Sequence, residues 1–123
     1  MKLQDEAYLL LTTLRRDGRE VSTPMWAAWD GAGRAYMQTD GGSAKVKRIR
    51  SQAKVWLAPC NARGQTHGDR VTAEARIIES SAEAEEADRR LGKRYGWARK
   101  GINLLLWLTG RRQRIYLALD LLV

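Results

Sequence analysis

Asp-Gly steps divide the first third of the chain into short apolar runs, and this punctuation limits the folds open to it. Asp17-Gly18 and Asp30-Gly31 each stand between two runs in which apolar and β-branched residues are frequent. Glycine adopts a positive φ at no steric cost, so such a step is typical of a β-hairpin. A third step, Asp40-Gly41, is followed by a helical pattern instead. The chain therefore begins as a three-stranded antiparallel meander that leads into a helix.

Apolar runs, most of them alternating with polar residues, indicate six strands in all. They cover residues 8–14, 20–30, 35–39, 54–60, 70–79 and 112–123. The second contains Pro24, which cannot donate a ladder hydrogen bond, so that strand is expected at a sheet edge or locally bulged. Six antiparallel strands in 123 residues must close or pair off their edges. We expect one domain over residues 1–123, mainly β with short helices, folded as a small six-stranded antiparallel barrel.

Helical patterns fill the intervals between some of these strands. A short basic helix begins near Ser43, a possible N-cap. Ser80 and Glu83 have the spacing of a capping box and introduce a helical composition over residues 82–95. Gly96 breaks this pattern, and residues 97–108 form a second helix or an irregular apolar cover that ends at Gly110.

The short basic helix has the pattern of an anion site. At 100° per residue, Val46 and Ile49 fall on one side, where they can be buried. Lys45 and Arg48 lie together along one edge of this apolar stripe, whereas Lys47 points away from it. Free backbone N–H groups, the positive end of the helix dipole and two adjacent cations all favour a bound anion. A solvated basic helix is the alternative interpretation.

The charge balance also favours an anionic partner. The chain has a formal net charge of +8 and a pI of about 10.1. Such a charge suits nucleic acid, a membrane surface or a phosphorylated small molecule. The polar, acidic N-terminus is unlike a signal peptide, and the apolar run over residues 104–108 is far too short to cross a bilayer. We expect a cytoplasmic protein without stable membrane insertion.

Signatures of nucleophilic, hydrolytic and metal chemistry are missing from the sequence. With one cysteine, Cys60, and one histidine, His67, there is no zinc-ligand cluster and no internal disulfide. We interpret Cys60 as a small packing residue and His67 as a solvated loop side chain. No Ser–His–Asp set or paired-carboxylate signature is present. An enzyme whose cofactor carries out the reactive chemistry needs none of these signatures, because the protein supplies only binding, orientation and electrostatics.

Several segments together resemble the pyridoxamine-phosphate-oxidase-like flavin-binding split barrels. The resemblance rests on residues 8–13, on Arg16-Asp17-Gly18, on Thr23-Pro24-Met25-Trp26 and on Asp30-Gly31. Residues 45–50, 57–64, which include Ala58-Pro59-Cys60, and 74–76 resemble the branch that uses the deazaflavin coenzyme F420, common in actinobacteria. The match runs from about residue 8 to residue 123.

This resemblance implies a homodimeric split β-barrel with two cofactor sites at the subunit interface. It implies an oxidoreductase that transfers hydride between reduced F420 and a small unsaturated or conjugated substrate. The cofactor phosphate would lie at Gly42-Ser43-Ala44 with Lys45 and Arg48, next to Val46, and the ring beside Pro24, Met25 and Trp26, bordered by Thr39. The polyanionic tail of F420 makes Arg63, Arg94 and Arg99 candidates for contacts with it. The resemblance supplies neither the substrate nor the catalytic residue that delivers a proton.

Three alternatives stay open. The same fold could bind FMN, whose phosphate would occupy the same basic helix. A basic β-barrel with exposed aromatic residues also suits single-stranded nucleic acid, with Trp26 and Trp56 as the available stacking surfaces. The fold could also store or carry the cofactor without turnover. We favour the F420 enzyme without a nucleic-acid partner.

The apolar residues near the C-terminus favour a homodimer on their own account. Residues 97–108 and the end of the last strand carry more apolar surface than one small barrel can bury. We therefore expect the chain to pair with a second copy of itself.

Overall fold

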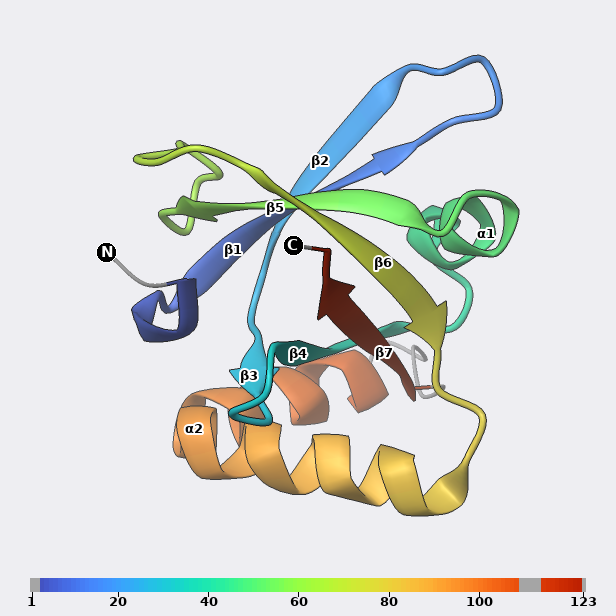
Figure 1. Ribbon diagram of the computed structural model, residues 1–123. Coiled ribbons are helices and arrows are strands. Elements are labelled where there is room, and N and C mark those ends of the chain that lie inside the picture. The colour runs from blue at the N-terminus through green and yellow to red at the C-terminus, as the bar shows by residue number, and fades with distance from the viewer. Residues whose placement is uncertain (1–2, 109–113, 123) are drawn as a thin grey trace.

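The computed structural model describes residues 3–108 and 114–122, apart from the side chains of Trp97, Leu106 and Trp107. Seven strands and three helices follow one another along this part of the chain (Figure 1). The elements are η1 (Leu3–Asp5), β1 (Tyr8–Leu14), β2 (Glu20–Met25), β3 (Ala28–Trp29), β4 (Arg34–Asp40), α1 (Ala44–Ser51), β5 (Lys54–Cys60), β6 (Val71–Ile77), α2 (Ser81–Leu108) and β7 (Arg114–Leu121).

The strands form one curled antiparallel sheet in the order β2-β1-β5-β6-β7-β4-β3. The sheet curls into a half-barrel (Figure 1) whose two end strands, β2 and β3, are consecutive in the chain. The predicted mainly β, antiparallel architecture is therefore confirmed. The strand that carries Pro24 lies at an edge of the sheet, as expected from its missing N–H group.

The prediction of six strands is wrong by one, because the segment 20–30 divides into β2 and β3. Ala27 and Ala28 are both buried, so the alternation of the run breaks between the two strands. The backbone of Ala27 pairs with side chains of α2 instead of a strand. Tyr95 Oη lies 3.1 Å from Ala27 N, and Arg94 Nη1 donates to Ala27 O at 2.8 Å. Helix α2 thus replaces a strand neighbour at this point, and the barrel stays split.

The main core lies inside the curl of the sheet. It gathers inward-facing residues from five strands together with Ala27, which lies between β2 and β3, and Ile49 of α1. Its buried members are Leu9, Leu11, Ala27, Ala35, Met37, Ile49, Val55, Leu57, Ala73, Ala75, Leu117 and Leu119. Val46 and Ile49 of α1 are both buried, whereas Lys47 and Arg50 are exposed. The apolar stripe predicted for this helix is confirmed.

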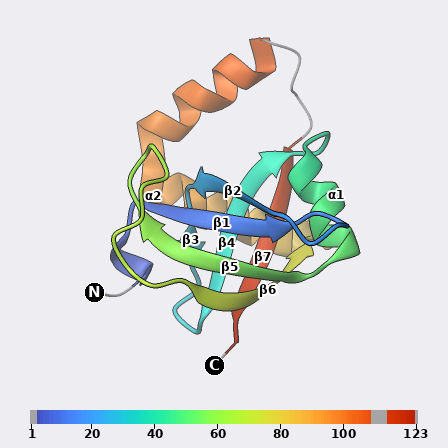
Figure 2. The same ribbon diagram turned by 90° about the horizontal axis from the view of Figure 1, so that it is seen from above.

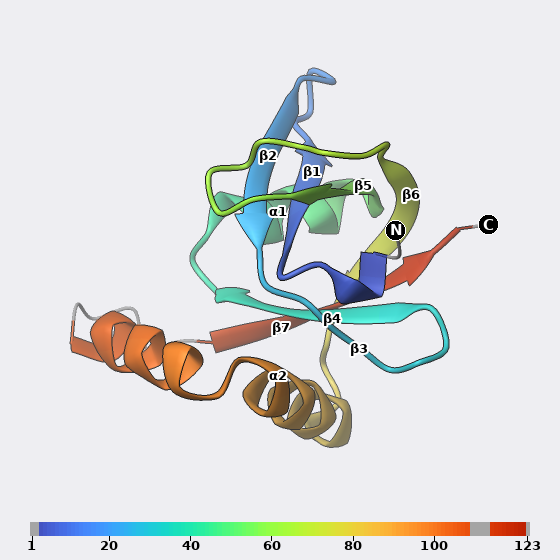
Figure 3. The ribbon, with the colours of Figure 1, turned by 90° about the vertical axis from the view of Figure 1, so that its left-hand side faces the viewer.

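Helix α2 packs on the outer face of the sheet and bends at Gly96. Its first half lies under β3, β4 and β7, with Ala87 and Leu91 buried against them (Figure 3). Gly96 has φ 50° and ψ −119°, a conformation outside the helical region that favours glycine. The predicted break at Gly96 is confirmed, and the predicted stop at Gly110 lies outside the described residues.

The second half of α2 extends away from the sheet (Figure 2). Its side chains at Ile102, Leu104, Leu105 and Leu108 are between 45% and 65% exposed. A contiguous group of exposed large apolar side chains such as this one is unusual on a surface that has no binding partner. None of the described helices is long and apolar enough to span a lipid bilayer.

Candidate functional site

The N-terminus of α1 presents backbone donors beside two cations. Ser43 occupies the N-cap position with an extended backbone, and its side chain makes no cap hydrogen bond. Ser43 Oγ lies instead 3.3 Å from Thr39 Oγ1, which links the helix start to strand β4. Because the first N–H groups of a helix have no partner within the helix, this end can accept an anion. The predicted segment Gly42-Ser43-Ala44 is at this position.

Lys45 and Arg48 are partly buried, and neither pairs with a carboxylate within residues 3–108 and 114–122. Arg48 Nε donates to Thr13 Oγ1 at 2.7 Å. Desolvation, followed by the charge of Arg48, lowers the pKa of Lys45, although Asp40 opposes the shift. Desolvation also lowers the pKa of Arg48. Both pKa values thus reflect cations that the fold partly desolvates without a direct ion pair among the described residues, and a bound anion would relieve that cost.

The side chains of Val46 and Lys47, the residues between these two cations, point away from the predicted anion site. Val46 is 1% exposed and its side chain belongs to the interior. Burial of this side chain leaves only the backbone of Val46 for a ligand, and its contact with the cofactor stays a prediction. Lys47 is exposed on the opposite face of α1, as its helical position predicts.

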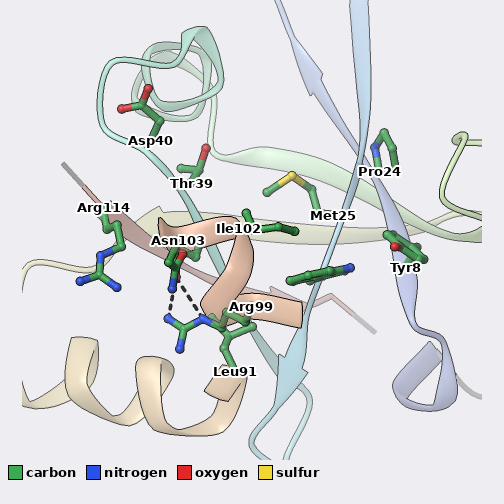
Figure 4. Close-up of a pocket in the computed structure, with 12 residues that line it drawn as sticks. Tyr8, Pro24, Met25, Thr39, Asp40, Leu91, Arg99, Ile102, Asn103 and Arg114 are labelled. Atoms are coloured by element: carbon green, nitrogen blue, oxygen red, sulfur yellow. Dashed lines mark hydrogen bonds between the residues drawn. The ribbon is translucent and has the colours of Figure 1, made fainter. Parts of the chain in front are cut away.

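A pocket of about 300 Å³ lies between the end of β2, strand β4 and the second half of α2 (Figure 4). Its lining residues are Tyr8, Pro24, Met25, Trp26, Gln38, Thr39, Asp40, Leu91, Arg99, Ile102, Asn103 and Arg114. The predicted ring-binding residues Pro24, Met25, Trp26 and Thr39 therefore come together. Lys45 and Arg48 do not line the pocket, but Thr39 joins it to the helix start through Ser43.

A rigid aromatic wall closes one side of this pocket. The rings of Trp26 and Tyr95 are stacked, with centroids 4.7 Å apart and planes within 6°. Tyr8 adds a tilted contact at 6.4 Å. Tyr95 Oη lies 2.9 Å from the carbonyl oxygens of both Ala27 and Ala7, which fixes its ring. Sequence reasoning missed Tyr95, because no local pattern relates a helix residue to Ala27, 68 positions away.

The polar side of the pocket rests on a buried arginine, Arg99. Its Nη2 donates to Asp88 Oδ1 at 2.6 Å and to Gln38 Oε1 at 2.5 Å. Tyr116 Oη also donates to Asp88 Oδ1, at 2.5 Å. Burial alone would raise the pKa of Asp88, but hydrogen bonds from Tyr116 and Arg99 outweigh it and hold that pKa below its ordinary value. The network joins both halves of α2 to strands β4 and β7.

The arginines considered for the polyanionic tail have different positions. Arg63 is exposed in the loop after β5. Arg94 donates to the backbone oxygens of Ala27 and Glu6 at 2.8 and 2.6 Å. Arg99 is engaged by Asp88. Both guanidinium groups therefore have partners within the fold, and a contact of Arg94 or Arg99 with the tail stays a prediction.

Cys60 and His67 lie outside the pocket lining. Cys60 is buried at the end of β5, and this burial raises the pKa of its thiol, as suits a packing residue. His67 is exposed, with Nε2 at 2.9 Å from a carboxylate oxygen of Glu6. Residues 3–108 and 114–122 contain no group of three His, Cys, Asp or Glu side chains that could hold a metal ion.

The two tryptophans considered as stacking surfaces for nucleic acid are both half-buried and have different partners. Trp26 is committed to Tyr95 and to the pocket. Trp56 lies on the outside of the barrel, with the Arg70 guanidinium 4.4 Å and the Lys54 ammonium 5.5 Å from its ring centroid.

Comparison with known proteins identifies the family of the chain. It matches the pyridoxamine 5'-phosphate oxidase family over residues 2–115. No curated protein matches it by sequence. The family resemblance seen in the sequence is thereby confirmed, whereas its F420 branch is not decided by this match.

Solved structures share the fold at low sequence identity. A proposed 5-nitroimidazole antibiotic resistance protein from Bacteroides thetaiotaomicron has a TM-score of 0.71 at 8% identity, over 97% of this chain and 75% of the other. HutZ, the heme storage protein of Vibrio cholerae, has a TM-score of 0.69 at 15% identity, over 98% and 84%. An F420 reductase has a TM-score of 0.62 at 17% identity, over 98% and 90%. At these identities the likeness shows the fold and leaves the ligand open.

Proposed function

The chain belongs to the pyridoxamine 5'-phosphate oxidase family, and from this premise we propose that it binds coenzyme F420 and transfers hydride between the reduced coenzyme and a small conjugated acceptor. The observation that carries the proposal is the pair of partly buried cations, Lys45 and Arg48, at the start of α1. Neither has a carboxylate partner among the described residues. A phosphate there would supply the missing counter-charge and accept hydrogen bonds from the helix N-terminus.

The pocket beside this site suits a flat ring. From the phosphate at α1, a ligand can pass Thr39 and enter the pocket with its ring next to Pro24, Met25 and Trp26. A volume of about 300 Å³ is at the lower end for ligand pockets, enough for a ring system but not for the whole coenzyme. The long tail of F420 would then lie along the basic surface. Segments 45–50, 57–64 and 74–76 favour F420 over FMN, and the F420 reductase of the same fold is compatible with that choice.

The protein's part in such a reaction is binding, orientation and exclusion of water. When bound, the deazaflavin supplies or takes up the hydride, and a proton is exchanged with the acceptor. Tyr8, Met25 and Ile102 give the pocket an apolar surface that limits water around the ring. The described lining contains no serine, cysteine or histidine, so the described part offers no nucleophile of those kinds at the ring.

Activity should survive removal of the only cysteine and the only histidine. We expect Cys60→Ala and His67→Ala to keep rates within about threefold of wild type, because neither side chain lines the pocket. The measurement is anaerobic oxidation of reduced F420 by a conjugated acceptor, followed through the absorbance of the oxidised coenzyme. A loss of several orders of magnitude in either variant, with its fold intact, would move the mechanism to covalent or acid–base catalysis.

A second copy of the chain is proposed to cover the exposed apolar face of α2. Leu104, Leu105 and Leu108 form this face, and Ile102 continues it into the pocket. A partner on this face would therefore border the ring site. We expect light scattering at micromolar concentration to give twice the chain mass of 13.9 kDa.

Charge placed on this face should separate the copies. The double variant Leu104→Glu/Leu105→Glu is expected to be monomeric, because pairing would desolvate two carboxylates. Ala82→Glu, at an exposed position in the first half of α2, is the matched control and should stay dimeric. A wild-type monomer in the presence of F420 would contradict the dimer.

A further inference from the structure

The polar side of the pocket contains two side-chain amides whose orientation is fixed by Arg99. An arginine has only donors, and its Nε and Nη2 lie 3.2 and 2.5 Å from Gln38 Oε1. Gln38 therefore accepts through its oxygen, and its amide nitrogen is left to donate. That nitrogen lies 2.8 Å from Asn103 Oδ1. The donors of Arg99 thus dictate which end of each amide faces which neighbour.

Asn103, the last residue in the hydrogen-bonded chain Arg99–Gln38–Asn103, has an amide nitrogen that can still donate. Asn103 accepts from Gln38 through Oδ1, so its Nδ2, with two N–H groups, faces away from that contact. Within residues 3–108 and 114–122 this nitrogen has no hydrogen-bond partner. Asn103 lines the pocket, and in the view of Figure 4 it lies above Arg99 and between Arg114 and Ile102. A fixed donor in a mainly apolar pocket selects ligands that bring an acceptor to it.

The other residues that line the pocket indicate the shape and polarity of the rest of the ligand. Trp26, whose ring is stacked on that of Tyr95, supplies a flat aromatic surface, and Met25, Leu91 and Ile102 are apolar. We propose that Asn103 is a specificity-determining residue, donating a hydrogen bond from Nδ2 to the carbonyl-type oxygen of a flat conjugated ligand that packs near Trp26. This inference deepens the proposed function and rests on it. Two molecules could bring that oxygen: the cofactor ring or the conjugated acceptor.

Two arms of one experiment distinguish these sources. The first titrates F420 and FMN into wild type, Asn103→Leu and Asn103→Asp. The second titrates two probes into the cofactor-loaded proteins, and into the proteins alone: 4-phenylbut-3-en-2-one, and its isostere with CH₂ in place of the carbonyl oxygen. Leucine matches the shape of asparagine without the donor, and aspartate keeps the acceptor for Gln38 while removing the donor. Gln4→Leu, on the exposed turn η1, is the control for an amide-to-leucine change.

Loss of one hydrogen bond should change a dissociation constant roughly 3- to 10-fold. If Asn103 holds the cofactor, both variants weaken F420 or FMN binding by that factor, and Gln4→Leu does not. If Asn103 holds the acceptor, cofactor binding is unchanged, and the preference of wild type for the ketone over its isostere disappears in both variants. If neither dissociation constant nor preference changes in folded variants, the inference is overturned. If no cofactor binds wild type, the proposed function fails, and the probe pair on the protein alone still decides the role of Asn103.

Discussion

Replacement of Asp88 by alanine is expected to destabilise the protein by about 3–5 kcal/mol, more than replacement of Arg99 by methionine. The side chain of Arg99 is 10% exposed, whereas that of Asp88 is 49% exposed. Asp88→Ala would leave a buried guanidinium without its counter-charge. Arg99→Met would leave a carboxylate that can turn to water, and methionine would keep most of the apolar stem. Urea unfolding monitored by circular dichroism measures both differences.

Low pH should reproduce part of the same effect. The pKa of Asp88 lies below its ordinary value, so its contribution to stability is present above that ordinary value and is lost as pH falls through the lowered pKa. Wild type should therefore lose more stability on acidification than Asp88→Ala. If Arg99→Met and Asp88→Ala lower the free energy of unfolding at neutral pH by equal amounts, the pair stabilises the fold through packing and not through charge.

Removal of Lys45 or Arg48 is expected to weaken F420 binding roughly 10- to 100-fold. A hydrogen bond to a charged group is worth about 1.5–3 kcal/mol, and that free energy corresponds to this range of affinities. Lys45→Ala should leave the unliganded protein at least as stable as wild type, because burial already disfavours the Lys45 charge. Arg48→Ala should cost some stability as well, since Arg48 donates to the buried Thr13 hydroxyl.

Lys47→Ala is the matched control for both variants. It removes the same charge from the same helix, but Lys47 is exposed on the face opposite the site. We expect it to bind F420 as wild type does at moderate salt, where distant surface charges are screened. If Arg48→Ala and Lys47→Ala bind F420 with equal affinity, the cations of α1 are only solvated surface charges, and the cofactor phosphate binds elsewhere.

Local pattern was sufficient to predict most of the elements. Alternation and Asp-Gly turns predicted the strands, and the helical wheel predicted which of Val46, Lys47 and Ile49 are buried. Gly96 was recognised as the break in α2. These features depend on neighbours within a few residues, so the sequence displays them directly.

Contacts between distant segments could not be predicted in this way. The split of the segment 20–30 depends on Tyr95 and Arg94, which bind the backbone of Ala27 from 67 or 68 positions away. The sequence over residues 20–30 has the pattern of a strand on both sides of Ala27. Nothing in it reveals that side chains of α2 bind the backbone of Ala27 in place of a neighbouring strand. The seventh strand and the aromatic wall beside Trp26 were missed for this one reason.

The basic composition was informative about the site only in part. A surplus of cations suggested anion-binding roles for Arg94 and Arg99, but the fold uses both to bind carbonyl and carboxylate groups of its own. Lys45 and Arg48 differ in being partly buried without a carboxylate partner among the described residues. Charge counts cannot distinguish these cases, because the difference lies in which partners the fold supplies.

An equilibrium titration of purified wild-type protein with F420, and separately with FMN, tests the central claim most directly. Coenzyme fluorescence reports binding in both cases. The account predicts saturable binding of one F420 per chain, with a lower dissociation constant than FMN and with competition between the two. Tighter binding of FMN, or no saturable binding of F420, would contradict it.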